Sequence, residues 1–356
     1  MTTLFDPLRL GSLTLPNRIV MAPLTRARAI PKTRVPVPLM AEYYVQRASA
    51  GLILSEATSV NPMGVGYVGT PGIWSDEQTE GWKPVTKAVH DAGGRIFMQL
   101  WHVGRVSDPE LLGGKLPVSA SAVQPAGHVS LLRPQRDYVT PRALETDEIP
   151  AIVAAYRNGA ENAKKAGFDG VQLHGANGYL LDQFLQDKTN QRSDAYGGTR
   201  EKRARLMLEA TDACIEVWGA DRVGMHLAPR ADAHDMGDSD RLATFTYVAR
   251  ELGKRGIAFI AAREARREDS IGPAVKDAFG GVYIANEGFT KETAEQALKD
   301  GVADAVAFGK SYIANPDLVA RFAAGAPLNA WDMATFYAGG PQGYTDYPAL
   351  REAETA

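Results

Sequence analysis

The residues best suited to chemistry in this chain are His174, Asn177 and Tyr179, which lie within one short segment. They follow Gly170–Leu173, an apolar run that predicts a buried strand. Parallel α/β folds place their chemistry at the carboxyl ends of such strands. The imidazole and the amide can donate hydrogen bonds to one oxygen, and the phenol can deliver a proton nearby. The trio therefore suits a reaction that polarises a carbonyl or nitro group and protonates the carbon beside it.

The composition narrows the classes of partner. The 356 residues are 45% hydrophobic and 23% charged, with a formal net charge of −3, which is typical of a globular protein. The absence of a basic cluster or a membrane-length apolar run argues against nucleic acid and membrane partners. Met1–Leu15 lacks the pattern of a signal peptide, so we expect a cytoplasmic protein. Cys214 is the only cysteine, and no carboxylate is spaced to join His174 and His226, so we expect no metal site.

Short runs rich in β-branched residues recur along the whole chain, with helical patterns in the intervals. They are Arg18–Pro23, Gly51–Glu56, Arg95–Leu100, Gly170–His174, Arg222–Leu227, Ala258–Ala262, Gly281–Ala285 and Ala303–Phe308. This β-then-α alternation predicts an α/β fold, a (β/α)8 TIM barrel, as a single domain over residues 1–356. Leu10–Pro16 is expected to form an N-terminal hairpin that closes the barrel floor.

One interval is too long for a simple connection. Val103–Glu145, after the third strand, is rich in proline and serine and has no convincing helix. Such a loop excursion above a barrel usually lines or covers the site. The helix that follows begins near Ile149, with Thr146 or Asp147 placed to cap it. A later run, residues 263–269, mixes both charge signs and is interpreted as a solvated loop.

A barrel gathers the polar residues at its strand ends into one pocket. Here they are Thr25, Glu56, Thr58, Gln99, Trp101, His102, His174, Asn177, Tyr179, His226 and Arg230. Glu56 is expected to meet a backbone amide. After the last two strands, loops containing Gly288 and Gly309–Lys310 predict a phosphate site, because backbone amides at such loops bind anions.

A series of short motifs, in a fixed order along the chain, is specific enough to indicate a protein family. They are Pro16–Arg18, Ala22–Arg26, Ser55–Thr58, Gln99–His102, His174–Tyr179, Asn190–Gly198, Ala307–Gly309, Ile313–Leu318 and Gly343–Pro348. With these motifs in this order, the chain resembles the Old Yellow Enzyme family of flavin-dependent ene-reductases, in the style of N-ethylmaleimide and xenobiotic reductases. The resemblance implies FMN, bound without a covalent link across the barrel mouth, and NADPH or NADH as hydride donor.

The same resemblance implies a role for individual residues. For the cofactor it implies Pro23, Leu24 and Thr25 against the isoalloxazine, Ala57 and Gln99 at its pyrimidine edge, and Gly288, Gly309 and Lys310 at the phosphate. For the substrate pocket it implies walls formed by Tyr67, Trp101 and Tyr344. His174 and Asn177 would hold the substrate oxygen, and Tyr179 would supply the proton.

The chain departs from the family pattern on the fifth strand, where His226 stands in place of the usual arginine at the flavin N1 edge. Either His226 is held protonated by the flavin, or Arg230 folds back to supply the charge. Imidazole is shorter than guanidinium, so we favour Arg230 making part of the contact, with Gln99 or a backbone dipole as a third solution. Lys310 also replaces an arginine, which keeps a charge but loses the bidentate fork.

These residues predict an FMN-dependent ene-reductase that reduces electron-poor C=C bonds of enones, maleimides and nitroalkenes with hydride from NAD(P)H. The alternative on the same flavin is reduction of nitrate esters or nitroaromatics. A barrel aldolase or isomerase is disfavoured, because no lysine occupies a convincing inner strand position for a Schiff base. A flavin-binding protein without turnover is disfavoured by the intact trio. We expect small-molecule substrates and a monomer or homodimer.

Overall fold

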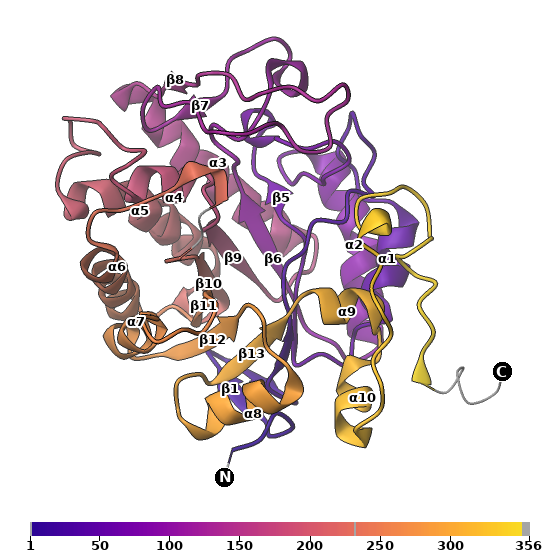
Figure 1. Cartoon of the computed structure of the whole chain (residues 1–356). Coiled ribbons are helices and arrows are strands. Elements are labelled where there is room, and N and C mark those ends of the chain that lie inside the picture. Colours follow the sequence, from indigo (N-terminus) through magenta and orange to yellow (C-terminus); the bar gives the residue numbers. More distant parts are fainter. Residues whose placement is uncertain (1, 231–232, 351–356) are drawn as a thin grey trace.

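The computed structural model describes residues 2–230 and 233–350 and is built around a ring of parallel strands (Figure 1). The ring strands are β3 (Ile19–Met21), β4 (Leu52–Leu54), β6 (Ile96–Trp101), β9 (Gly170–Gly175), β10 (Val223–Leu227), β11 (Phe259–Arg263), β12 (Val282–Asn286) and β13 (Ala305–Phe308). Within the described residues each pairs in parallel with its neighbours, and the β4–β6 pairing closes the ring. The predicted (β/α)8 barrel is therefore confirmed, and each predicted strand agrees to within two residues at its ends.

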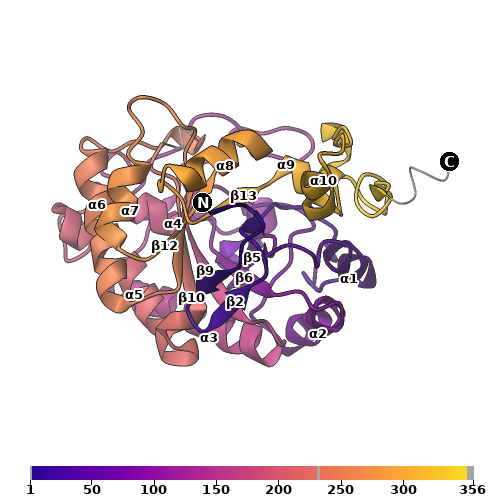
Figure 2. The same ribbon diagram turned by 90° about the horizontal axis from the view of Figure 1, so that it is seen from below.

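Helices surround the ring and cover its outer face (Figure 2). They are α1 (Pro38–Val45), α2 (Asp76–Asp91), α3 (Ile149–Lys165), α4 (Leu180–Leu185), α5 (Arg200–Trp218), α6 (Arg241–Arg255), α7 (Gly272–Phe279), α8 (Lys291–Lys299), α9 (Lys310–Ala314) and α10 (Leu318–Ala324). Their buried apolar residues and the outward residues of the strands form the larger core. Among the described residues, none of these helices has the length and apolar character needed to cross a membrane.

The lower part of the barrel interior is a packed apolar layer. Successive strand residues point to opposite sides, so Phe97 of β6 and Phe259 of β11 face inward. Their rings fill the space opposite Gly170 and Gly224, where an added Cβ would lie 2.4 and 2.3 Å from the nearest ring atom. Two strands thus carry glycine at these inward positions, which leaves room for the two phenyl rings at the barrel centre.

The N-terminal hairpin closes this layer from below, as Figure 2 shows. It consists of the antiparallel strands β1 (Leu8–Leu10) and β2 (Leu13–Leu15). Leu10 and Leu15 are fully buried in the same cluster as the two phenyl rings. The predicted floor hairpin is confirmed, with its first strand starting two residues before the expected Leu10.

The long excursion lies at the opposite end of the barrel from the hairpin (Figure 1). Its ordered elements are one 3-10 turn, Pro109–Leu112, and the two-residue strands β7 (Val118–Ser119) and β8 (Arg142–Ala143), while β5 (Thr58–Ser59) pairs beside β6. Its apolar side chains form one cluster with the pocket aromatics; the buried members are Ala57, Tyr67, Trp101, Val103, Val106, Val129, Leu132 and Tyr138. The excursion therefore covers part of the barrel mouth, as its length and position predicted.

The start of α3 differs from the expected cap. The helix begins at Ile149, but a 3-10 turn over Thr146–Glu148 precedes it. The capping contact joins Glu145 and Glu148, whose carboxylate accepts the Glu145 N–H at 2.8 Å. The Thr146 hydroxyl instead donates to Asp194 at 2.6 Å. The prediction that Thr146 or Asp147 caps the helix is wrong, because the extra turn moves the cap to Glu145.

Candidate active site

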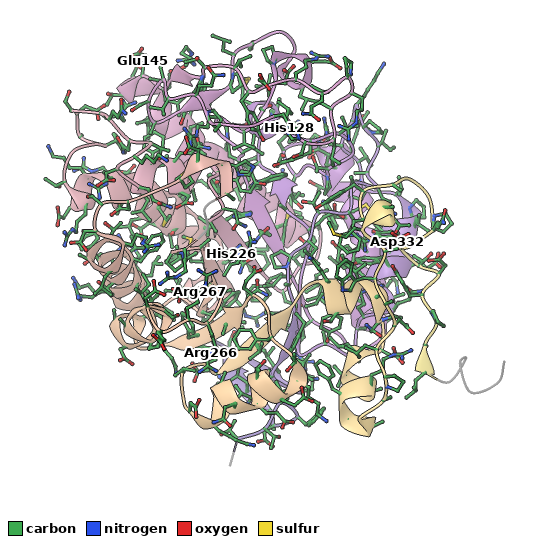
Figure 3. The ribbon with its side chains drawn as sticks, in the orientation of Figure 1. His128, Glu145, His226, Arg266, Arg267 and Asp332 are labelled. Carbon is green, nitrogen blue, oxygen red and sulfur yellow. The ribbon has the colours of Figure 1, made fainter. Side chains whose placement is uncertain are left out.

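A polar layer lies above the phenyl rings at the barrel mouth. Gln99 and Gln172 are paired across β6 and β9, and His174 and His226 are paired across β9 and β10. The Gln99 amide nitrogen donates to Gln172 Oε1 at 2.8 Å and lies 3.2 Å from His226 Nδ1. The two imidazole centroids are 5.0 Å apart. Figure 3 labels His226 among the side chains of the strand region, between the excursion above and the hairpin below.

Both imidazoles are neutral in this environment. An amide nitrogen only donates, so His226 Nδ1 is the acceptor and its proton is on Nε2. Burial, together with the positive charge of Arg263, lowers the pKa of His226 to about 3. Burial and the neighbouring His226 and Arg263 hold the pKa of His174 well below its ordinary value. The surroundings of His226 therefore oppose the protonated form that one of our two alternatives required.

The turn after β9 presents Asn177 and Tyr179 to the mouth. Asn177 has φ of 58° and Gly178 has φ of 78°, a left-handed pair that asparagine and glycine tolerate best. The Gly178 N–H donates to Asp182 Oδ2 at 2.9 Å, and Gln183 Nε2 donates to the Gly178 carbonyl at 2.7 Å. These two contacts join the turn to α4.

Tyr179 is surrounded by the aromatic groups expected around it. Its hydroxyl lies 3.0 Å from the Tyr67 hydroxyl, and its ring meets both Trp101 and His174 edge-on with centroids 4.9 Å apart. Burial raises the pKa of the Tyr179 phenol above its ordinary value. The phenol is therefore protonated at neutral pH and can act as a proton donor. The structure thus brings the trio together with Tyr67 and Trp101.

The residues at the mouth fit a flat ligand with polar edges. His174 Nδ1, Gln172 Nε2 and Trp101 Nε1 are buried without a hydrogen-bond partner in the described chain, which is unusual for buried polar atoms. The expected flavin-contacting stretch Pro23–Thr25 follows β3 directly and is only partly buried, whereas Ala57, after β4, is buried. FMN carries the hydrogen-bonding ring edge that such orphaned groups can satisfy.

The expected phosphate loops follow β12 and β13. A Cβ added at Gly288 would have no heavy atom within 4 Å, and at Gly309 its nearest neighbour would be Leu24 at 3.4 Å. The backbone of both loops is therefore accessible to a ligand. Lys310 Nζ, however, lies over the Trp331 ring at 4.7 Å from its centroid. The structure thus directs the lysine charge to an aromatic face rather than to the two glycine loops.

Two other predicted residues are engaged away from the trio. Arg230 pairs with Glu264 at 3.2 Å and with Asp269 at 2.6 Å. Tyr344 stacks on Tyr43 with ring centroids 4.1 Å apart. Within the described residues these two carboxylates, and not the trio, bind the Arg230 guanidinium, so the structure gives no support to Arg230 as the cation at the flavin edge. Tyr344 likewise packs against α1 rather than with Tyr67 and Trp101.

Arg263 is the site residue that sequence reasoning missed. It was assigned to a solvated charge run, but it is the last residue of β11 and has the inward parity of Phe259. Its Nη1 donates to Asn177 Oδ1 at 3.1 Å, and its Nε donates to Glu287 Oε2 at 2.5 Å. Extending the predicted strand by one residue and continuing its alternation would have placed Arg263 on the interior face.

The rest of that charge run is also only partly solvated. Residues 266–269 are exposed, as expected. Glu264, however, is buried and accepts the N–H groups of Ile271 at 3.0 Å and Gly272 at 2.7 Å. The prediction of a fully solvated loop is therefore wrong for its first two residues, which the strand end and the start of α7 hold.

For Glu56 the expected backbone partner is present, because its Oε2 accepts the Arg26 N–H at 3.2 Å.

Comparison with known proteins identifies the family. A family model described as NADH:flavin oxidoreductase / NADH oxidase matches residues 3–329. The chain is 44% identical to 12-oxophytodienoate reductase 1 of Oryza sativa subsp. japonica, over 99% of this chain and 94% of that protein. It is 43% identical to a probable flavin mononucleotide-dependent alkene reductase of Leishmania infantum, over 98% of this chain and 97% of that protein.

Solved structures agree with these relatives. The old yellow enzyme homologue from Zymomonas mobilis superposes with a TM-score of 0.95 at 46% identity, covering 98% of this chain and all of that one. Morphinone reductase in complex with tetrahydroNAD superposes with a TM-score of 0.94 at 49% identity, covering 98% of each chain. The protein is therefore a TIM-barrel flavin oxidoreductase. It belongs to the Old Yellow Enzyme family and is an NAD(P)H-dependent, FMN-dependent oxidoreductase of the ene-reductase type.

Proposed function

We propose that this enzyme reduces the electron-poor C=C bonds of enones, maleimides and nitroalkenes, with NADPH as the favoured hydride donor over NADH. The observation that supports this most is the convergence of three groups at one mouth. His174 lies in β9 and Asn177 and Tyr179 lie in the turn after it, and the rings of Tyr179 and His174 meet edge-on with centroids 4.9 Å apart. Two donors for an oxygen beside one proton donor are what addition across an activated double bond requires.

The protein groups have separate tasks in this proposal. Bound FMN would supply the hydride chemistry that no side chain of this chain can perform. His174 and Asn177 would hold the carbonyl or nitro oxygen and stabilise the negative charge that develops on it. Tyr179 would protonate the carbon next to the polarised group, and Tyr67 and Trp101 would wall the pocket. Because the target carbon is strongly basic, positioning matters more than the acidity of the phenol.

The cofactor contacts in this proposal follow the strand ends. Pro23, Leu24 and Thr25 would lie against the flavin ring, and Ala57 and Gln99 would meet its pyrimidine edge. The backbone around Gly288 and Gly309 would hold the phosphate, with Lys310 contributing charge if it leaves the Trp331 face. We also propose a cytoplasmic protein that is monomeric or homodimeric, on the sequence observations alone.

Colour provides the first test. We expect a yellow protein with one FMN per chain, released by acid, because the family resemblance implies a flavin bound without a covalent link and the cysteine Cys214 is buried in α5. The flavin should bleach anaerobically with NADPH and recover its colour on addition of 2-cyclohexenone. FAD in the extract, or colour that stays with the precipitated protein, would contradict the cofactor proposal. Recovery with a nitrate ester or nitroaromatic but not with any enone, maleimide or nitroalkene would favour the alternative substrate class, since His174 and Asn177 can hold a nitro oxygen as well.

A further inference from the structure

Arg263 reaches the mouth from a strand that supplies none of the predicted site residues. Within the described chain its Nη1 donates to Asn177 Oδ1 at 3.1 Å and its Nε donates to Glu287. Its side chain remains 41% exposed, and that of Glu287 remains 40% exposed. An ion pair this open contributes little to folding stability. The contact with Asn177 therefore calls for a reason other than stability.

The Arg263 contact decides how Asn177 presents its amide. A guanidinium has five donors and no acceptor, so the Asn177 atom that faces it must be the oxygen. The Asn177 amide nitrogen then points away from Arg263, and within the described residues it makes no hydrogen bond, so it is free to donate to a ligand. Arg263 thus sets Asn177 as a donor, which is the role that an oxygen ligand beside His174 requires. Without this contact the amide could rotate and present its oxygen, which would repel such a ligand.

Glu287 holds Arg263 from the other side at a backbone cost. Glu287 has φ of 101°, a conformation that side-chain-bearing residues rarely adopt, and it precedes Gly288 in the expected phosphate loop. Backbone strain of this kind persists where the surroundings fix it and is concentrated at functional sites. The carboxylate at this strained position receives the Arg263 Nε–H. Asn177, Arg263 and Glu287 therefore form a chain of contacts from the β9 turn to the loop after β12.

The other candidates for a positive charge at the mouth are engaged or neutral. Arg230 is bound by Glu264 and Asp269. His226 and His174 are both buried, and the charge of Arg263 acts on each of them. Among these candidates, Arg263 is therefore the cation that contacts the oxygen-binding pair, through Asn177.

We infer that Arg263 is the cation of this site: it positions Asn177 as a donor and stabilises negative charge on the bound oxygen and on the reduced flavin. The inference rests on the proposed function, because it uses His174 and Asn177 as the oxygen-binding pair. In this chain Arg263 on β11 thus takes over the role that we had assigned to His226 or Arg230. It is a positioning residue for Asn177, and Glu287 is the positioning residue for Arg263.

The test uses the FMN-loaded enzyme and two measurements that do not depend on turnover. The first is titration of the oxidised enzyme with 4-hydroxybenzaldehyde, whose phenolate should give a long-wavelength charge-transfer band. The second is the midpoint potential of the flavin. Arg263→Gln removes the charge, Arg263→Lys keeps the charge without the fork, and Glu287→Gln removes the anchor. Arg267→Gln is the matched control, because it removes one positive charge from an exposed position of the same loop.

We expect Arg263→Gln to weaken phenolate binding about tenfold to a hundredfold, the usual effect of losing a hydrogen-bonding network to a charged group. Its midpoint potential should fall, by about 30 mV for each tenfold loss of preference for the reduced form in a two-electron couple. In Arg263→Lys the midpoint potential should stay close to that of the wild type, because the charge remains, but phenolate binding should weaken. Glu287→Gln should weaken phenolate binding and lower the midpoint potential less than Arg263→Gln does. Binding of neutral 2-cyclohexenone should change less than phenolate binding in every variant.

Equal phenolate affinity and potential in Arg263→Gln and Arg267→Gln would overturn the inference. The double variant His174→Ala with Asn177→Ala separates this failure from that of the proposed function. If the double variant loses phenolate binding while Arg263→Gln does not, the oxygen-binding pair stands and Arg263 is not its cation. If the double variant also binds normally, the proposed pair is itself wrong. Should Arg263→Gln fail to retain FMN, Arg263→Lys and Glu287→Gln decide, and wild-type phenolate binding in both would overturn the inference.

Discussion

The two ends of the barrel interior differ in the chemistry of their buried side chains, which are apolar at the floor and polar at the mouth. At the floor, Phe97 and Phe259 fill a closed apolar layer that the hairpin seals with Leu10 and Leu15. At the mouth, one layer higher on the same strands, amides and imidazoles are buried, and several of their polar atoms lack partners in the described chain. Burying an unpaired polar atom destabilises the folded state, whereas burying a phenyl ring stabilises it. The floor thus fills its own space with apolar side chains, whereas the mouth presents polar atoms with which a ligand can pair.

This contrast follows from the parity of the strands. Each inward position of β6 and β9 lies two residues from the next, so the layers run from Phe97 to Gln99 and from Gln172 to His174. The same strand therefore carries a stability residue at its start and a functional residue at its end. Changes at the two ends should be separable in experiment, and the following predictions test that separation.

The largest effect is expected at the mouth, from Tyr179→Phe. Loss of the proton donor should slow alkene reduction by about 10²–10⁴-fold, the usual contribution of a positioned general acid. Reduction of the flavin by NADPH requires no such proton and should change little. Stopped-flow measurement of the two half-reactions separates them. Tyr67→Phe is the matched control, since it removes the partner hydroxyl at 3.0 Å and should slow alkene reduction less. Equal slowing of both half-reactions in Tyr179→Phe would make the residue structural.

The next largest effect is expected at the floor, from Phe259→Ala. Removal of this fully buried ring should lower the free energy of unfolding by about 3–5 kcal/mol, because a cavity remains opposite Gly224. Urea unfolding of the FMN-loaded enzyme measures the loss, and Phe259→Leu should lose less. At low temperature the folded variant should bind phenolate as the wild type does. A weakening of phenolate binding comparable with the loss of stability would show that the two layers are not independent.

The smallest effect is expected from Glu56→Gln, close to the mouth. Burial raises the pKa of the Glu56 carboxyl from 4.5 to about 7. The folded state therefore holds this proton more tightly than the unfolded state, so the Glu56 contribution to stability is full below about pH 4.5 and is lost as pH rises through about 7. The loss is at most about 3 kcal/mol.

Glutamine cannot ionise, so the Tm of Glu56→Gln minus that of the wild type should become more positive as pH rises from 5 to 8. Glu268→Gln, at an exposed position, controls for the loss of one negative charge. A Tm difference for Glu56→Gln that stays constant over this range would show that Glu56 does not titrate with a raised pKa. It would also mean that this part of the mouth tolerates a buried carboxylate.

Most of the scaffold was predictable because it depends on local patterns. Eight apolar runs with β-branched residues produced the ring, and the parity of β9 put Gln172 and His174 on the same face. The trio was predictable for the same reason, since His174 lies near the end of β9 and Asn177 and Tyr179 lie in the turn that follows it. The cap of α3 was not, because the 3-10 turn before Ile149 depends on how Glu145 and Glu148 meet.

By itself, the sequence determined the barrel, the floor hairpin and the covering excursion, and it grouped the three residues of the proposed trio, all of which depend on periodicity or on residues close together in the chain. Only the tertiary structure decided which arginine serves the mouth. Strand parity can place Arg263 on the interior face, but it does not say which groups the guanidinium of Arg230 or of Arg263 meets. Those partners are carboxylates from other segments, Glu264 and Asp269 for Arg230 and Glu287 for Arg263. A long flexible side chain follows its partners, and those partners are brought to it only by the folded barrel.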